Sequence, residues 1–360
     1  MNPYQDLPPD AFWRPSIAER SMFDIDGLWK PKFEIDKKSK VSTYGSCFAQ
    51  HIGNALVRNG YNWLLTERAL QKTSDELARK YNYGIFTSRT GNIYTTSLLK
   101  QWIDWCSNNI PQPTEIWKKG DRYYDPFRPA VEPNGFASEE ELEMSRKHTI
   151  SCFQRSIRRA DFFVFTLGLT ESWINSETGI EYPMCPGTVA GNFDESCHKF
   201  RNLTFMETYD NLRGSIEEMM KINPKLKFLL TVSPVPLTAT YSGDHVLVAT
   251  VNSKSILRAV AGTLASEMEN VDYFPSYEII TSPTFKGIFY GPNQRSVMKA
   301  GVDFVMSQFF RSIGDPQDGT SEPARRNGRS KNRQLNQQNT KIKNSKEVCE
   351  EELLDAFGSK

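Results

Sequence analysis

Four short segments of the chain are apolar throughout or β-prone, and each is expected to form a buried strand. They are Lys40–Tyr44, Asp161–Leu167, Lys227–Val232 and Val271–Phe274. An antiparallel strand with one wet face alternates apolar and polar residues, whereas a strand covered on both faces is apolar along its whole length. The pattern therefore predicts a sheet that is buried on both sides.

Amphipathic helical segments separate these strands. A helix is expected to follow the first strand and to stop at Asn59-Gly60. Ser138 and Thr204, each with a glutamate three residues later, are predicted to cap two more helices. A further helix is expected after Asn252 and a last one from about Val297 to Phe310. This alternation predicts an α/β domain whose parallel sheet is wound through right-handed crossovers.

Two stretches before the C-terminal region fit this repeat less well. Residues 1–32 are polar and proline-containing, and are expected to form an N-terminal extension. Residues 73–125 contain helical segments, aromatic residues and prolines, with a hairpin expected around Thr90-Gly91. We interpret residues 73–125 as an insertion or lid within a single folded domain that spans residues 33–313.

The C-terminal residues 314–360 differ from the rest in composition. They are rich in Gly, Pro, Ser, Asn, Gln, Arg and Lys, and cannot bury enough apolar area to offset the entropy of the chain. We expect a disordered basic tail that binds an acidic partner, with a short acidic amphipathic helix at Glu347–Phe357. The whole chain has a formal net charge of +1 and the stretch from Arg325 to Lys346 is rich in Arg and Lys, so the rest of the chain is slightly acidic on balance. The folded domain therefore carries no electrostatic signature of nucleic-acid binding.

The N-terminus and the cysteines bear on the cellular compartment. The first 15 residues lack the basic start and apolar core of a secretory signal, and the apolar run Phe162–Leu169 is too short to span a membrane. The six cysteines have no CxxC spacing, which is typical of reduced thiols. We therefore expect a cytoplasmic protein with no membrane span, disulfide, metal site or cofactor.

Chemically useful side chains follow the strands, at the edge where open parallel sheets bind ligands. After the first strand, Gly45 permits a tight turn that places the Ser46 hydroxyl at a helix N-terminus. Free N–H groups and the positive end of the helix dipole stabilise negative charge there, so a nucleophile carries part of its own oxyanion hole. Two alternatives stay open: serine is a common helix cap, and the Cys47 thiol is a rival nucleophile that more often packs as a small hydrophobe.

Several separated motifs resemble those of one family. Gly45-Ser46-Cys47-Phe48-Ala49 is the signature of the GSCFA family, and similar segments follow in the family's order at Thr166–Glu171, Pro186-Gly187-Thr188 and Ser233-Pro234-Val235. The likeness runs from about Phe33 to Phe310. GSCFA proteins resemble the SGNH hydrolases, a flavodoxin-like superfamily of esterases, lipases and carbohydrate O-acyl transferases or deacetylases. The resemblance implies a three-layer sandwich around a central parallel sheet, with Ser46 as the nucleophile.

The chain departs from the SGNH pattern in two places. Gly168 and Thr170 lie where SGNH enzymes have Gly-x-Asn, so a threonine hydroxyl replaces the asparagine amide of the oxyanion hole. Asn92, beside Gly91, is a candidate for the missing amide. SGNH enzymes also have Asp-x-x-His near the C-terminus, whereas the best-aligned stretch here is Asn293-Gln294-Arg295-Ser296. The expected general base is absent.

The histidines are the remaining candidates for the base, which must come within about 2.6–3.2 Å of the serine hydroxyl. They are His51, His148, His198 and His245. The first two are expected to pack on helices, away from the site. His198 and His245 follow the second and third strands; His245 is preferred because it is closer to the helix start expected at Asn252-Ser253-Lys254, which could bind an anion. Histidines that only hydrogen-bond the backbone are the commoner case. Glu171 and Glu278 are candidates to orient the base.

The favoured interpretation is a serine-dependent ester hydrolase or O-acyl (acetyl) transferase that acts on a small molecule or on carbohydrate or polysaccharide-linked substrates. A set of aromatic residues near the expected site suits sugar rings, although ordinary packing is the commoner explanation: Trp173, Tyr182, Tyr273, Phe274 and Tyr277. The alternative is an SGNH-like glycan-binding module without a complete triad. A third interpretation makes the basic tail the functional part, as a tether for RNA, a membrane or a partner.

Overall fold

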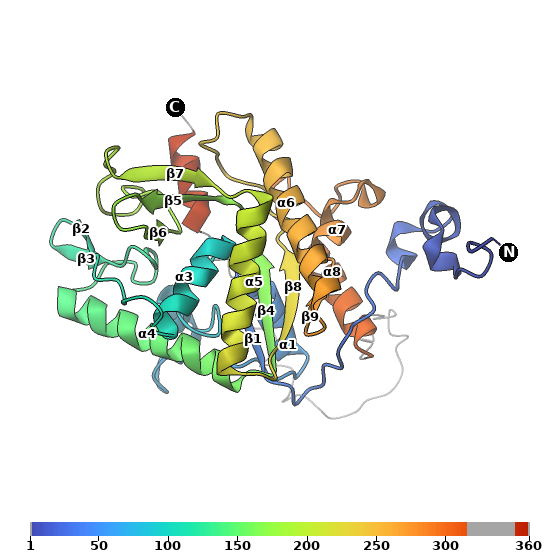
Figure 1. The fold of residues 1–360 in the computed structure, drawn as a ribbon, viewed down its shortest axis with the longest axis horizontal. Helices are drawn as coiled ribbons and strands as arrows, with labels where there is room; N and C mark the ends of the chain where they lie inside the picture. The colour runs from blue at the N-terminus through green and yellow to red at the C-terminus, as the bar shows by residue number, and fades with distance from the viewer. Residues whose placement is uncertain (1, 315–349, 359–360) are drawn as a thin grey trace, which may run out of the picture.

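A four-stranded parallel sheet forms the centre of the molecule (Figure 1). The computed structural model describes residues 2–314 and 350–358. The strands lie side by side in the order β1 (Val41–Gly45), β4 (Phe162–Leu167), β8 (Lys227–Val232) and β9 (Val271–Tyr273). All four strands expected from the sequence are confirmed.

The free edge of β1 is partly covered by a fifth segment. Trp63 makes a single parallel bridge to Val41, supported by hydrogen bonds from Val41 N–H to the Asn62 carbonyl and from Leu64 N–H to the Val41 carbonyl. When this bridge is counted as the second strand, the spatial order becomes 2-1-3-4-5. This is the order of the flavodoxin-like doubly wound sheet.

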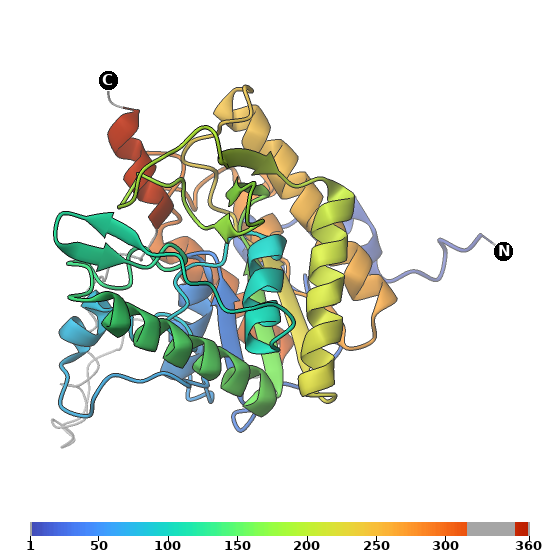
Figure 2. The same cartoon turned by 60° about the vertical axis from the view of Figure 1, so that its left-hand side comes forward.

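Helices cover both faces of the sheet, because successive strand residues point to opposite sides. In β4, Phe163 and Phe165 pack with one layer of helices, whereas Phe162 and Val164 pack with the other. The first layer contains α3 (Thr96–Cys106), α4 (Glu139–Arg159), α5 (Phe205–Ile222) and α6 (Val246–Glu267) (Figure 2). The second contains α1 (Ala49–Arg58), α7 (Ser276–Thr281) and α8 (Lys299–Ser312). The expected three-layer α/β fold is confirmed.

Helix capping agrees with the sequence at two helices and differs at a third. The side chains of Ser138 and Thr204 cap α4 and α5, the latter with a complete capping box. The expectation that α6 starts after Asn252 is wrong, because the ring of His245 accepts the Leu247 N–H and caps the helix seven residues earlier. The Asn252-Ser253-Lys254 segment therefore lies inside α6, where its N–H groups bond within the helix and do not form an anion site.

Residues 73–125 divide into a buried part and a peripheral part. The short α2 (Asp75–Lys80) lies near the surface, and α3 belongs to the helical layer, with Trp102 and Trp105 in the core. The expectation of a hairpin at Thr90-Gly91 is wrong. Backbone groups of that stretch bond to the open edge of β1 instead, and the hairpin forms later, between β2 (Trp117–Lys119) and β3 (Arg122–Tyr124).

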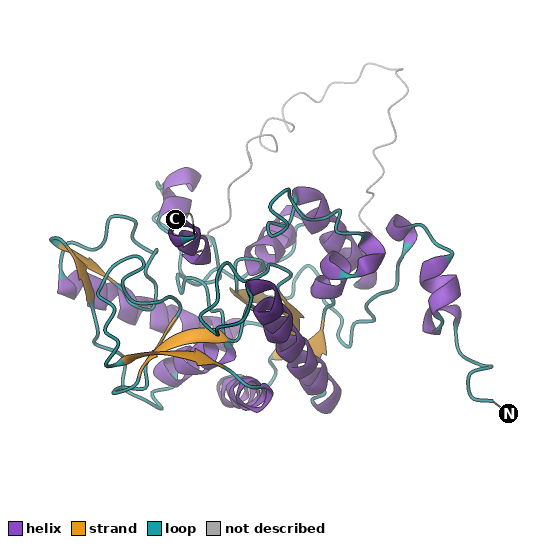
Figure 3. Ribbon diagram, turned by 90° about the horizontal axis from the view of Figure 1, so that it is seen from above, coloured by secondary structure: helices purple, strands orange, loops and turns teal. Residues whose placement is uncertain are grey.

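A second, antiparallel sheet follows β4 and was not expected. Its strands lie in the order β6 (Glu181–Tyr182), β5 (Glu171–Asn175) and β7 (His198–Asn202). These strands are short and mostly polar, so they lack the apolar signal of the central sheet. Viewed from above, the small sheet lies to one side of the body and the N-terminal segment projects from the other (Figure 3).

Short helical turns lie near both ends of the chain and before α8. They are η1 (Pro9–Ala11), η2 (Arg14–Ala18) and η3 (Met22–Asp24) in the N-terminal segment, η4 (Pro283–Phe285) before α8, and η5 (Glu350–Phe357) near the C-terminus. The last lies within the stretch expected to form an acidic helix. The remainder of the expected disordered tail, residues 315–349 and 359–360, lies outside the described residues.

Across the part of the chain that is described, no helix has the length and apolar character needed to cross a membrane.

Candidate functional site

The turn after β1 places Ser46 at the carboxyl edge of the central sheet. Gly45 has a φ of +125°, and a Cβ at this position would lie 2.2 Å from the carbonyl oxygen of Thr166 on the neighbouring strand. The Ser46 N–H donates to the same oxygen at 3.0 Å, and the Ser46 carbonyl accepts the Ala49 N–H at 2.9 Å, which begins the turn into α1. Only glycine fits this close approach with a positive φ, so Gly45 fixes the position of Ser46.

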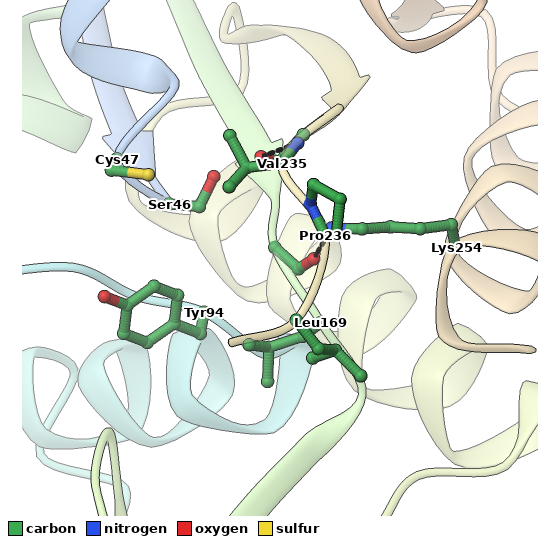
Figure 4. Close-up of a pocket in the computed structure, with 10 residues that line it drawn as sticks. Ser46, Cys47, Tyr94, Leu169, Val235, Pro236 and Lys254 are labelled. Atoms are coloured by element: carbon green, nitrogen blue, oxygen red, sulfur yellow. Dashed lines mark hydrogen bonds between the residues drawn. The ribbon is translucent and has the colours of Figure 1, made fainter. Parts of the chain in front are cut away.

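A small pocket surrounds the Ser46 side chain (Figure 4). It is lined by Ser46, Cys47, Tyr94, Gly168, Leu169, Ser233, Val235, Pro236, Leu237 and Lys254. Its volume of about 10 Å³ is on the order of the room for one water molecule. Ser46 is only 3% exposed, and its Oγ finds no hydrogen-bond partner among the described residues. A buried hydroxyl without a partner requires an explanation, and its place in a pocket at the carboxyl edge of the sheet distinguishes Ser46 from the other buried hydroxyls of this kind.

The segment that leaves β8 closes this pocket. Val235, Pro236 and Leu237 all line it, and the Val235 N–H donates to Ser233 Oγ at 3.3 Å. Two side chains from the stretch before α8 hold the segment down: Tyr290 Oη donates to the Pro234 carbonyl at 2.7 Å, and Arg295 Nε donates to the Pro236 carbonyl at 3.2 Å. Since the pocket has room for about one water molecule, a larger substrate reaches Ser46 only when part of the pocket wall moves.

Lys254 is a pocket residue that the sequence analysis did not identify as part of the site. It enters from α6, on the side opposite Ser46 in Figure 4, is 2% exposed, and its Nζ donates to the Gly168 carbonyl. The signal in the sequence is a lysine on the same face of a helix as Leu257 and Ala261, which both belong to the core. Such a position is typical of an apolar side chain, so a lysine there requires an explanation.

The three residues expected to form the oxyanion hole lie in different surroundings. Gly168 lines the pocket, but its N–H donates to the Tyr94 carbonyl at 3.0 Å and is not available to an oxyanion in this conformation. The Thr170 hydroxyl donates to Asn202 Oδ1 at 2.7 Å, on the side of β7. Asn92 is buried beside the end of β1 and is not among the residues that line the pocket.

The structure brings none of the histidines into the pocket lining. His245 is exposed at the N-cap of α6. His198 lies on β7, where Nδ1 accepts the Asp194 N–H at 3.0 Å and the ring packs against Tyr182. The ring of His51 packs against Phe48, and His148 contacts Cys152. The role of base that the sequence analysis assigned to His245 or His198 is therefore not supported by their positions.

The two expected supporting carboxylates also lie outside the pocket lining. Glu171 accepts the Thr240 hydroxyl at 2.7 Å. Glu278 accepts hydrogen bonds from Arg258 and from the Tyr273 hydroxyl. Both carboxylates are thus engaged with side chains other than a histidine.

The aromatic residues singled out from the sequence do not form one surface. Phe274 is buried in the second helical layer and Tyr182 is buried in the first. Trp173, on β5, instead contacts two residues that were not anticipated, Phe193 and Tyr241, with ring centroids 5.3 and 5.1 Å away. Phe193 and Tyr241 are 44% and 69% exposed, so a partly open aromatic surface lies on the small sheet.

Comparison with known proteins assigns the family. The model of the GSCFA family matches residues 40–309, three quarters of the chain, including Ser46, Gly168 and Lys254. No curated protein and no solved structure matches the chain. The match covers the whole central sheet and the pocket at its edge, and on this basis the chain belongs to the GSCFA family.

Proposed function

We propose that this protein is a serine-dependent ester hydrolase or O-acyl transferase in which Ser46 is the nucleophile. The observation that carries the proposal is the unsatisfied Ser46 Oγ, held in a pocket at the carboxyl edge of a parallel sheet by a turn that only glycine permits. A structural serine in such a turn normally caps a backbone N–H. Here the hydroxyl is kept for another partner.

The start of α1 suits acyl chemistry. The first N–H groups of α1, on Ala49, Gln50 and His51, are bonded to the carbonyls of Ser46, Cys47 and Phe48, so the contribution of this helix is the positive end of its dipole. An ester carbonyl attacked by Ser46 Oγ would develop its negative charge near that end of the helix. Electrostatic stabilisation of this kind is commonly the largest contribution to catalysis of acyl transfer.

The pocket and its surroundings favour a particular substrate class. Tyr94, Leu169 and Leu237 give the pocket apolar walls, and its small size favours a short acyl group such as acetyl. The aromatic surface of Trp173, Phe193 and Tyr241 favours a carbohydrate as the alcohol part of the ester, because sugar rings stack on aromatic faces.

Hydrolysis of p-nitrophenyl acetate tests the proposal. Ser46→Ala is expected to lower kcat/KM by at least about 10³-fold, as removal of a nucleophile does in serine hydrolases. Ser215→Ala is the matched control, since Ser215 is also buried, with a hydroxyl that has no partner among the described residues, but lies on α5 outside the pocket lining. Cys47→Ala separates the serine from the neighbouring thiol. Equal loss in Ser46→Ala and Ser215→Ala, or full activity in Ser46→Ala, would contradict the proposal.

A second candidate function is a glycan-binding module with no hydrolytic activity. The absence of histidine and carboxylate side chains from the lining of the described pocket favours it. This alternative predicts that the wild-type protein leaves p-nitrophenyl acetate intact. It also predicts that Trp173→Ala weakens the binding of glycans, measured by calorimetry, while Ser46→Ala does not.

A further inference from the structure

We propose that a second cavity, at the amino edge of the central sheet, binds the phosphate group of a small organic molecule. Lys40 precedes β1 at this edge, whereas Ser46 follows β1 at the carboxyl edge, so the cavity is separate from the pocket described above. The sequence motifs and the family match assign it no ligand. The inference therefore goes beyond the proposed function and does not depend on it.

Three segments of the chain form this cavity. Lys40 lies directly before β1, Arg159 is the last residue of α4, and residues 62–68 follow α1 along the outer edge of β1. The Lys40 carbonyl accepts the Asp161 N–H at 2.8 Å, which joins the first two segments, and the parallel bridge to β1 holds the third. The side chains that line the cavity are therefore attached to fixed parts of the fold.

Three cationic side chains line the cavity: Lys40, Arg68 and Arg159. No carboxylate belongs to the lining, and among the described residues none of the three cations forms an ion pair. Arg68 Nε donates to the Leu65 carbonyl at 3.4 Å. All three cations are exposed, so a ligand can reach them without movement of the chain. A cavity lined by cations of this kind attracts anions.

Carboxylates next to these cations in the sequence have other partners. Glu67 is buried and accepts the Arg89 N–H at 2.9 Å, and Asp161 accepts the backbone N–H of Lys40 at 2.8 Å. The helix does not supply the positive charge either, because α4 ends at the cavity and the carboxyl end of a helix carries the negative end of its dipole. The attraction for an anion therefore comes from the cationic side chains.

The size and lining of the cavity indicate the class of ligand. Its volume of about 290 Å³ is close to that of the smaller sites at which proteins bind small molecules, and is more than a bare inorganic anion fills. Guanidinium groups match the oxygens of phosphate with paired hydrogen bonds. Leu64 and Leu65 make part of the wall apolar, which suits an organic group. A phosphate monoester has both parts.

Calorimetric titration of the full chain with phenyl phosphate at low ionic strength tests the inference. Arg159→Gln is expected to weaken binding at least about tenfold, because it removes a charged hydrogen-bond donor from the cavity. Arg68→Gln should weaken binding in the same way. Arg158→Gln is the matched control and should bind as the wild type does. Arg158 is also exposed in the last turn of α4, but it lies outside the cavity lining and bonds Gln154 at 3.4 Å.

Two results of the titration would overturn the inference. One is the absence of phenyl phosphate binding by the wild type. The other is an equal affinity of Arg158→Gln and Arg159→Gln, which would show that only the overall charge attracts the ligand. Because the substituted residues are exposed, both variants are expected to fold, and thermal unfolding checks this. If Arg159→Gln does not fold, Arg68→Gln and Lys40→Gln decide.

Vesicles that contain phosphatidic acid distinguish a lipid headgroup from a soluble phosphate. Binding to these vesicles without binding to phenyl phosphate would overturn a small-molecule site. Binding to phenyl phosphate that depends on Arg159 and Arg68, with no binding to vesicles, is the predicted result. No ester takes part in these measurements, so their outcome is independent of the role proposed for Ser46.

Discussion

At the scale of single residues, Gly45 determines where the Ser46 hydroxyl can lie. Its positive φ and its contact with Thr166 let β1 pair with β4 up to the last residue before the turn. A strand-turn-helix pattern is local, so the positions of Gly45 and Ser46 could be predicted from the sequence. The position of Lys254 could not, because it depends on how α6 packs over the sheet.

Gly45→Ala is expected to destabilise the protein by at least about 2 kcal/mol, because an alanine must adopt an unfavourable φ and its Cβ must displace the backbone of β4. Gly84→Ala is the matched control: Gly84 also has a positive φ, of +68°, but a Cβ there meets nothing within 4 Å. Urea denaturation measures the free energy of unfolding of both variants. Equal losses of unfolding free energy would show that the contact with Thr166 does not constrain the turn.

At the scale of elements, the sequence predicts the central strands and most helices but not the way in which the remaining segments attach. Strands buried on both faces carry a strong apolar signal, whereas β5 and β7 are short and polar. The start of α6 was misplaced because a histidine cap is a weak signal compared with serine or threonine. That error moved the candidate base to His245 and obscured the burial of Lys254.

A buried ion cluster attaches the segment after β3 to α4. The Asp125 carboxylate bonds Arg128 at 2.8 Å and Arg146 of α4 at 3.1 Å, and all three side chains are buried. Burial raises the pKa of Asp125, but the charges and hydrogen bonds of Arg146 and Arg128 outweigh it, so that the pKa lies below its ordinary value of 3.8. The carboxylate therefore contributes stability above about pH 4 and loses it as the pH falls through the lowered pKa.

Asp125→Asn is expected to cost about 3–5 kcal/mol at neutral pH, because two guanidinium groups stay buried without their counter-charge. The free energy of unfolding of the wild type should decrease as the pH drops below 4. The difference in this free energy between wild type and Asp125→Asn should narrow over the same range. Chemical denaturation at a series of pH values measures this. A difference that stays constant down to the lowest pH would contradict the assignment to Asp125.

At the scale of the whole molecule, the C-terminal helix η5 contacts the part of the fold that closes the pocket. Glu352 lies 3.8 Å from Arg295, the residue that also donates to the Pro236 carbonyl above Ser46. The tail was expected from composition to be independent of the domain, but composition does not reveal a docking contact between residues so far apart in the chain. This contact places η5 beside a residue that holds one wall of the pocket.

Truncation after Gly314 is expected to leave the fold intact, because no described residue beyond 314 belongs to the buried hydrophobic clusters. Loss of the Glu352 contact should loosen Arg295 and residues 234–237, so that fluorophosphonate labels Ser46 faster. Glu352→Gln in the full chain should also speed the labelling of Ser46, by a smaller factor than the truncation. Slower labelling of a truncated protein with an unchanged Tm would argue against a closing role for η5.

The most direct test of the role of Ser46 is to trap its acyl intermediate. The protein is mixed with p-nitrophenyl acetate, quenched in acid and digested with trypsin, and the peptide Val41–Arg58 is sequenced by mass spectrometry. An acetyl group on Ser46, absent from Ser46→Ala and unaffected by Cys47→Ala, is the predicted result. Acetylation confined to Cys47 or to lysines, with Ser46 unmodified while ester is consumed, would contradict a serine nucleophile.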